Sequence, residues 1–346
     1  MNNRNLLTAF NLAQECDLIY SGIFTSEQLK KIDISEYRIV KKLQNKQIVI
    51  KRNNIFFFDN IKIFSCLDFV EELFYLIKKY KINDQIILYT HQSDKSINKS
   101  LFSKKPENIK DWYSTNIDYF HTDLHSLPIG IADNDRKNLS ISEISNYLKT
   151  KKTPNGLDDT KLLYVNFREN TNLNHRKGLY DYFQQFNWAL VDDSNLSNED
   201  YLKKIAKFPF VFCPWGNGFD SHRIWESLSV GSIPVTKAHI TFEQYKDVPI
   251  VLVNDYNEIS RDYLLNLQNK FLSKKLSNNE IFLDFWIDPK TSRVSNKENR
   301  LLNSNLIFIN FKEVFYFLNL FIRSKKKIIK YYILKIKEKL LFTKEK

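Results

Sequence analysis

The chain has 346 residues, of which 43% are hydrophobic and 14% aromatic, and its formal net charge is +12. This length exceeds one typical core and predicts two domains, which the apolar content suffices to fill. The three cysteines are isolated and form no CxxC pair, which argues against a disulfide scaffold and a zinc site and fits a reducing cytoplasm.

The beginning of the chain lacks the features of an export signal. The apolar run over residues 6–13 is broken by Asn11, and only Arg4 precedes it. No stretch of about 18 uncharged apolar residues occurs, so no membrane-spanning helix is predicted. We therefore expect a cytoplasmic protein.

Short apolar runs alternate with a helical pattern in residues 1–153, which predicts a first Rossmann-like α/β domain. Strands are expected at 17–20, 47–50, 54–58 and 85–90, and a helix at 67–80. His91 and Asp94 follow the last of these strands. Ligand groups gather at the carboxyl ends of parallel strands, so both residues are candidates for acting on a bound acceptor. A solvated turn explains them equally well.

A polar loop at 150–160, with Pro154 and Gly156, is the predicted domain boundary. Beyond it, strands are expected at 161–167, 188–191, 210–213, 233–236 and 248–253, separated by helices that begin near residues 176, 198, 221 and 256. This alternation predicts a parallel sheet within residues 157–290. The expected fold class is therefore α/β, with two doubly wound Rossmann-like domains facing a cleft. Arg168, after the first of these strands, is placed near a bound diphosphate, with His175 and Arg176 close by.

Residues 208–236 are the most informative stretch and read FPFVFCPWGNGFDSHRIWESLSVGSIPVT. An apolar strand leads into a loop with Gly216 and Gly218, where a ligand can approach the backbone. A helix then begins at Ser221 or His222. A helix N-terminus after a glycine loop presents N–H groups and a positive dipole end to an anion.

Arg223 and Glu226 share one face of this helix. An arginine can bind a phosphate through two parallel hydrogen bonds, and a glutamate can accept hydrogen bonds from ribose hydroxyls. The candidate donor-binding residues are Arg168, Gly216, Asn217, Gly218, Ser221, His222, Arg223 and Glu226. An ordinary α/β unit, in which Arg223 and Glu226 pair with each other, is the alternative.

This stretch resembles the exostosin-like family of glycosyltransferases. The resemblance rests on Cys213-Pro214, Gly216, Gly218, Arg223, Glu226, Gly231 and Ile233-Pro234-Val235. A looser second match includes Trp112, Asn116, His121, His125 and Pro128-Ile129-Gly130. The resemblance implies the two-domain GT-B fold, with residues 1–153 on the acceptor side. It also implies transfer of a sugar from a nucleotide diphosphate donor, usually a uridine one, without a metal in the active site.

The family resemblance also implies inversion at the sugar, which requires a general base. Asp94 is the first candidate and His91 the second. Gly216, Gly218, the helix N-terminus and Arg223 would stabilise the leaving diphosphate, and Glu226 would hold the ribose. No cofactor is expected, and the acceptor is expected to be a glycan or a lipid-linked molecule of cell-surface polysaccharide synthesis.

Two other functions stay open. A fucosyltransferase-like enzyme would use a guanosine donor, but the Glu-Lys pairing usual in the corresponding helix is absent around Trp225-Glu226-Ser227. A non-enzymatic protein would use its basic tail to bind a membrane or a nucleic acid. Because the charge is confined to one end of the chain, no nucleic acid is expected.

Two sequence features resemble metal ligands. His121 and His125 have the i, i+4 spacing that on a helix could bind a metal, but no third ligand is evident. Asp133 and Asp135 resemble the acidic triplet of another glycosyltransferase fold, yet they lie in a polar loop after a glycine. No metal site is expected.

The C-terminal end is predicted to be helical and basic. Residues 301–322 are strongly apolar and, in a GT-B enzyme, would form a helix that returns to the first domain. Residues 323–346 hold ten basic and two acidic residues, a net charge of +8 that leaves +4 for the rest of the chain. Their apolar residues recur at helical spacing, so we expect this tail to dock on the inner face of an anionic membrane. A solvated or disordered end is the alternative.

Overall fold

The structure is a computed structural model that describes residues 4–132, 143–144, 161–193, 195–245, 248–272, 279–287 and 300–303. All of these residues except Asn303 belong to one unit, Met1–Leu302. The predicted boundary loop at 150–160 and the basic tail at 323–346 lie outside the described residues.

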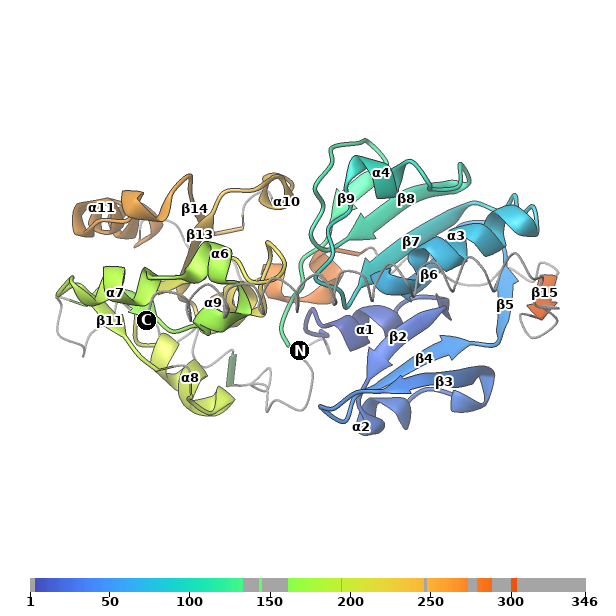
Figure 1. Ribbon diagram of the computed structural model, residues 1–346, viewed down its shortest axis with the longest axis horizontal. Helices are drawn as coiled ribbons and strands as arrows, with labels where there is room; N and C mark the ends of the chain where they lie inside the picture. The colour runs from blue at the N-terminus through green and yellow to red at the C-terminus, as the bar shows by residue number, and fades with distance from the viewer. Residues whose placement is uncertain are drawn as a thin grey trace, which may run out of the picture. The chain divides into compact units, whose positions relative to one another are not determined.

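The first sheet has five parallel strands in the order β1-β6-β7-β8-β9 (Figure 1). They are β1 Leu18–Ile19, β6 Ile61–Cys66, β7 Ile86–His91, β8 Ile109–Ser114 and β9 Leu124–Ser126. The parallel α/β character agrees with the prediction. The strand order follows the chain, however, and lacks the reversal that defines a doubly wound sheet. The prediction of a doubly wound sheet is therefore wrong for this sheet. Each crossover connection adds the next strand at the same edge of the sheet.

Helices cover both faces of the first sheet. On one face, Phe74 of α3 Val70–Lys79 meets Trp112 edge to face, with ring centroids 5.2 Å apart. Phe10 of α1 Ala9–Gln14 belongs to a different buried cluster, with Phe64 and Tyr89. Because neighbouring residues of a strand face opposite sides, the alternation along β7 fills both cores.

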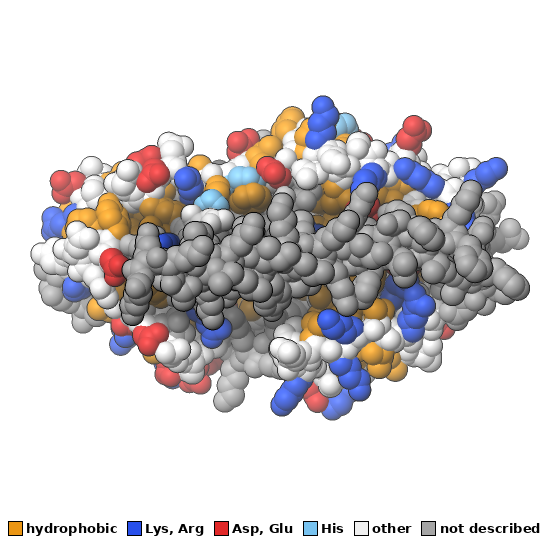
Figure 2. Space-filling view, in the orientation of Figure 1, with side chains coloured by type: hydrophobic (Ala, Val, Ile, Leu, Met, Phe, Trp, Pro, Cys, Tyr) orange, Lys and Arg blue, Asp and Glu red, His pale blue; other side chains and the backbone are white. Residues whose placement is uncertain are grey.

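A small antiparallel sheet is inserted between β1 and β6, with strand order β2-β4-β3. Its strands are β2 Ser21–Phe24, β3 Tyr37–Lys42 and β4 Ile48–Arg52. Figure 2 shows Lys and Arg side chains gathered over the region where Figure 1 places α2, β3 and β4. The apolar pattern predicted β4 but not β3, whose residues are mostly exposed.

A two-stranded sheet joins β5 Asn54–Phe57 to β15 Arg300–Asn303. The predicted helix over 301–322 is therefore wrong at its beginning, and its remainder lies outside the described residues. Pairing between the strands satisfies the backbone hydrogen-bonding groups at the edge of β5. This requirement arises from the tertiary fold, and the spacing of apolar residues along the chain does not reveal it.

The second sheet has five parallel strands in the order β11-β10-β12-β13-β14. They are β10 Leu163–Val165, β11 Ala189–Val191, β12 Phe210–Phe212, β13 Ile233–Lys237 and β14 Val251–Val253. All five were predicted. Counted within this sheet, the order is 2-1-3-4-5, a doubly wound order whose reversal lies between β10 and β12.

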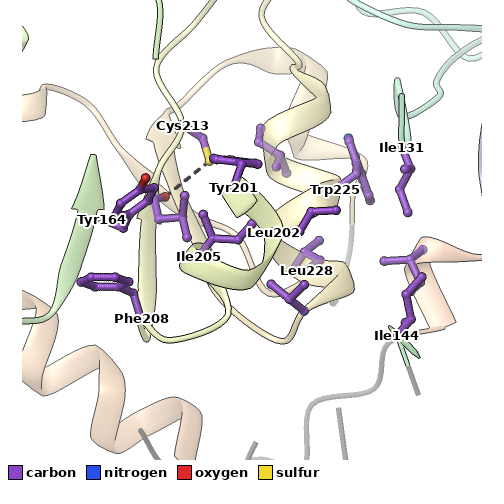
Figure 3. Packing of buried hydrophobic residues seen from close by; sticks show 14 of the residues in the cluster. Ile131, Ile144, Tyr164, Tyr201, Leu202, Ile205, Phe208, Cys213, Trp225 and Leu228 are labelled. Carbon is purple, nitrogen blue, oxygen red and sulfur yellow. Dashed lines mark hydrogen bonds between the residues drawn. The ribbon is translucent and has the colours of Figure 1, made fainter. Parts of the chain in front are cut away.

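The helices of the second sheet cover both of its faces. They are α6 Leu173–Arg176, α7 Leu179–Gln184, α8 Asn198–Ile205, α9 His222–Ser229 and α11 Arg261–Leu272. Tyr164 and Val211 belong to one buried cluster with Tyr201 and Leu202 of α8 and Trp225 and Leu228 of α9. Figure 3 shows this cluster from close by. Phe210 and Phe212 pack on the opposite face with Phe183 of α7 and Leu264 of α11. The predicted helix near Arg176 is two short helices, because Gly178 between them has a φ of 77°.

The remaining helical elements with bounds inside the described part of the chain are short. They are α2 Ser26–Leu29, α4 Lys99–Phe102, α10 Ile240–Glu243 and the 3-10 turns Ile34–Glu36, Leu67–Phe69, Glu169–Thr171, Tyr256–Glu258, Asn279–Ile281 and Leu283–Phe285.

Candidate functional site

A cavity of about 760 Å³ lies at the carboxyl ends of β10 and β12, where the strand order of the second sheet reverses. In open parallel sheets this position is where ligands bind. The lining includes all eight predicted donor-binding residues: Arg168, Gly216, Asn217, Gly218, Ser221, His222, Arg223 and Glu226. Asp94 and Ile129, from the first half of the chain, complete the wall together with Asn166, Thr171, Arg176, Asp220 and residues of the α8 region.

Arg176 fixes the glycine loop that follows β12. It is buried, and its Nε, Nη1 and Nη2 donate to the carbonyls of Trp215, Arg168 and Pro214 at 2.7, 2.9 and 2.9 Å. The pKa of Arg176 is lowered to about 10, mainly by burial and secondly by the nearby charge of Arg223. The side chain therefore stays charged at neutral pH. The sequence placed Arg176 near a diphosphate. The structure shows that its Nε and Nη2 hold the backbone of the loop, while its Nη1 holds the backbone of Arg168.

Asn116 holds the same loop from the first half of the chain. Its Oδ1 accepts hydrogen bonds from the backbone N–H groups of Phe219 and Asp220 at 2.9 and 3.0 Å. The residue is buried in the left-handed conformation, with φ 55°. A Cβ at Gly218 would lie 2.5 Å from Asn116 Nδ2, so only glycine fits there without displacing Asn116.

Gly218→Ala should lower the free energy of unfolding by roughly 1–3 kcal/mol, the usual cost of forcing an extra carbon into a packed site. The matched control is Gly216→Ala in the same loop, where an added Cβ would lie 3.2 Å from its nearest neighbour, Arg176 Nη2. Urea denaturation of both variants measures the difference. Equal losses would contradict a clash specific to Gly218.

Helix α9 presents its N-terminus to the cavity. Ser221 occupies the N-cap position in an extended conformation but makes no side-chain cap hydrogen bond. Its Oγ is buried and, among the described residues, has no hydrogen-bond partner. The first-turn N–H groups of a helix have no partners within the helix, so the absence of a side-chain cap favours an anion here. His222 Nδ1 donates to the carbonyl of Gly130 at 2.7 Å, which leaves the lone pair of the neutral ring on Nε2.

Arg223 and Glu226 line the cavity one turn apart on α9. The guanidinium carbon of Arg223 lies 5.6 Å from the ring centroid of Tyr201, a cation–π distance. Within the described part of the chain, its buried Nε has no hydrogen-bond acceptor. A bound anion would supply that acceptor. Glu226 is buried, with only 3% of its surface exposed.

Asp220 is a site residue that the sequence did not indicate. Its carboxylate accepts hydrogen bonds from the backbone N–H of Ile129 at 2.8 Å and from Trp225 Nε1 at 3.0 Å. The hydroxyl of Tyr245 lies 3.4 Å away. Burial raises the pKa of Asp220 to about 7, although these hydrogen bonds act in the opposite direction. Asp220 thus links the N-terminus of α9 to the turn at Ile129.

The two candidate bases occupy different positions. Asp94 is exposed, lines the cavity and accepts a hydrogen bond from Asn217 Nδ2 at 3.2 Å. His91 is 2% exposed and is not part of the lining. Its Nδ1 accepts from the Gln92 N–H at 2.7 Å, so its Nε2 donates to the Ile129 carbonyl at 3.1 Å. Burial, followed by His222, lowers the pKa of His91 to about 3. The structure therefore brings Asp94, and not His91, to the glycine loop.

The histidine pair with i, i+4 spacing does not lie on a helix. His125 is in the strand β9, where its Nε2 lies 2.8 Å from Asp111 Oδ1, and His121 precedes that strand. Asp133 and Asp135 lie outside the described residues. Among the described residues, no group of three His, Cys, Asp or Glu side chains could hold a metal ion.

Comparison with models of known protein families finds no match, and comparison with curated proteins finds none either. In the part of the chain that the structure describes, no helix has both the length and the apolar character needed to cross a membrane.

Proposed function

We propose that the chain is a GT-B-like glycosyltransferase that moves a sugar from a nucleotide diphosphate donor to a glycan or a lipid-linked acceptor. One observation supports this best. The donor-binding candidates of one glycine loop and one helix meet Asp94 in a single cavity, at the strand-order reversal of the second sheet. A parallel sheet with this order binds nucleotides at that position in many unrelated proteins, so the assignment rests on the side chains of the site and not on the fold alone.

The proposed donor lies with its diphosphate against the N-terminus of α9. As the bond between the sugar carbon and the phosphate oxygen breaks, negative charge grows on the diphosphate. The helix N-terminus, Arg223 and Arg168 stabilise that charge from fixed positions. Glu226 accepts hydrogen bonds from the ribose hydroxyls. The same groups would also bind the donor before the reaction begins. They raise the rate only as far as they stabilise the negative charge that develops on the diphosphate in the transition state.

The acceptor hydroxyl approaches from the side of Asp94. Its oxygen forms the new bond to the sugar carbon on the face opposite the leaving diphosphate, and its proton passes to the Asp94 carboxylate. The product has the inverted configuration. Asn217 holds this carboxylate in place through the 3.2 Å contact. The reaction needs no metal in this scheme, because protein groups neutralise the diphosphate, and it is proposed to serve cell-surface polysaccharide synthesis in the cytoplasm.

Uridine diphosphate should raise the melting temperature of the full chain, and the shift should persist in EDTA. A ligand at 100 times its dissociation constant stabilises the folded state by about 2.7 kcal/mol. The screen compares UDP, GDP and their common sugar conjugates by thermal shift. Stabilisation by guanosine compounds alone would select the fucosyltransferase-like alternative. A response to neither nucleotide would contradict the proposed site, and a response that requires manganese or magnesium would contradict metal independence.

A further inference from the structure

A second strongly basic region lies outside the C-terminal tail, so the prediction that the positive charge is confined to one end of the chain is wrong. Residues 30–52 contain eight Lys or Arg residues and two acidic ones, a net charge of +6. This excess is larger than the +4 that the whole chain carries outside its last 24 residues. The region spans η1 Ile34–Glu36, β3 and β4, and it does not contribute to the cavity described above.

Among the described residues, five of these cations have no acidic partner. Lys31 is one of them, and its ammonium lies 5.9 Å from the centroid of the Phe10 ring. Lys51 pairs with Glu72, Arg52 with Glu36 at 3.5 Å and Lys30 with Glu27 at 2.7 Å. Arg38, Lys41, Lys42 and Lys46 are exposed, and they form no ion pair within the described part of the chain. Unpaired cations that repel one another destabilise a surface, so this cluster favours an anionic partner.

Three apolar side chains are exposed beside these cations. Ile39 is 51% exposed, Val40 is 46% exposed and Ile34 is 42% exposed. The strand register shifts between Ile39 and Lys41, which makes Val40 an extra residue in β3. We call Ile34, Arg38, Ile39, Val40, Lys41, Lys42 and Lys46 together the β3 surface.

Protection of a sheet edge does not account for the composition of this surface. Because β3 is the last strand of its sheet, lysines on it discourage pairing with other strands. That role explains Lys41 and Lys42. It gives no reason to expose Ile39 and Val40, which would promote association.

We propose that the β3 surface docks the protein on an anionic phospholipid membrane. Lipid phosphates satisfy the cations, and the boundary between headgroups and acyl chains takes up the apolar side chains. A nucleic acid backbone would satisfy the cations but not the apolar residues. A second copy of the chain would bring like charges together. The inference does not depend on the proposed sugar transfer, and it concerns different residues from the tail.

The test is flotation of the full chain with vesicles of equal parts phosphatidylglycerol and phosphatidylcholine. The charge variant Arg38→Gln/Lys41→Gln/Lys42→Gln should lower the partition coefficient on the order of 100-fold, at about 1 kcal/mol per basic residue near an anionic leaflet. The control variant removes the same charge from three other exposed lysines: Lys99→Gln/Lys110→Gln/Lys207→Gln. Both proteins keep the tail, so the tail's own contribution cancels in the comparison.

A loss in the charge variant at least tenfold greater than in the control supports the proposal, and any smaller difference overturns it. An apolar variant, Ile39→Thr/Val40→Thr, keeps the β-branched shape and should bind more weakly than the wild type at 0.5 M salt. Unchanged binding of the apolar variant there would also overturn the proposal. So would a charge variant that loses affinity for an RNA duplex, or loses self-association in light scattering, while it floats with vesicles like the control.

Discussion

Arg223→Ala should lower kcat/KM for sugar transfer by roughly 10- to 150-fold, while the protein stays folded. The loss of hydrogen bonds to a charged phosphate costs about 1.5–3 kcal/mol, and each 1.36 kcal/mol is a factor of ten. Arg223 is suited to this contact because it lines the cavity one turn into α9 and its buried Nε lacks an acceptor among the described residues. The rate is measured with the sugar nucleotide that the thermal-shift screen identifies.

Two companion variants separate charge from geometry. Arg223→Lys keeps the charge but loses the planar fork, so it should recover only part of the rate. Arg261→Ala removes an exposed arginine at the start of α11 and should behave as the wild type. Glu226→Ala should also abolish most of the transfer, and Glu226→Gln tests the same contact with less change in shape. Wild-type rates in both Arg223→Ala and Glu226→Gln would show that α9 does not bind the donor.

The free energy of unfolding should contain a contribution from Asp220 that is lost as the pH rises from about 4 to about 7. Burial raises the pKa of this carboxyl to about 7 in the folded protein, whereas an unfolded aspartate has a pKa of about 3.9. The folded state therefore binds the extra proton in this window, and stability falls with rising pH. The full difference of about 3 pKa units corresponds to about 4 kcal/mol. Below about pH 4 the contribution is fully present.

Asp220→Asn isolates this contribution because asparagine stays neutral at every pH. His91 acts in the opposite direction: burial lowers its pKa to about 3, so its contribution to stability is lost as the pH falls below about 6.5. Since both proteins contain His91, the difference in free energy of unfolding between wild type and Asp220→Asn cancels it. Urea denaturation at pH 4, 5.5 and 7 should show a difference that changes steadily in favour of the variant. A constant difference would mean that Asp220 does not titrate in this range.

The second sheet could be predicted from the sequence because its strands are short, apolar and separated by helices. The first sheet could be predicted only in part. Strand β6 contains the buried polar residues Lys62 and Ser65, and β8, which reads IKDWYS, mixes polar and apolar residues. Neither has the continuous apolar run of a central parallel strand. The exposed strand β3 has no buried face from which its period could be read.

The donor-binding candidates could be predicted because most of them lie within one short stretch after β12. The roles of Arg176 and Asn116 could not, since they act on the backbone of a loop that is distant in sequence. Asp220 was overlooked for a related reason. Its partners Ile129 and Tyr245 come from other elements, and burial, which the sequence does not show, is what raises its pKa.

The hydrogen bonds between Asn116 and the glycine loop have a consequence for the evolution and engineering of this protein. The side chain that shapes the loop comes from the first sheet's half of the chain, whereas the loop belongs to the second. An isolated fragment carrying only the second sheet would lack the Asn116 oxygen that accepts hydrogen bonds from the N–H groups of Phe219 and Asp220. A chimera whose first half has another residue in place of Asn116 would lack the same two hydrogen bonds. The two halves are therefore not interchangeable modules, and mutations at Asn116 and Gly218 should be inherited as a pair.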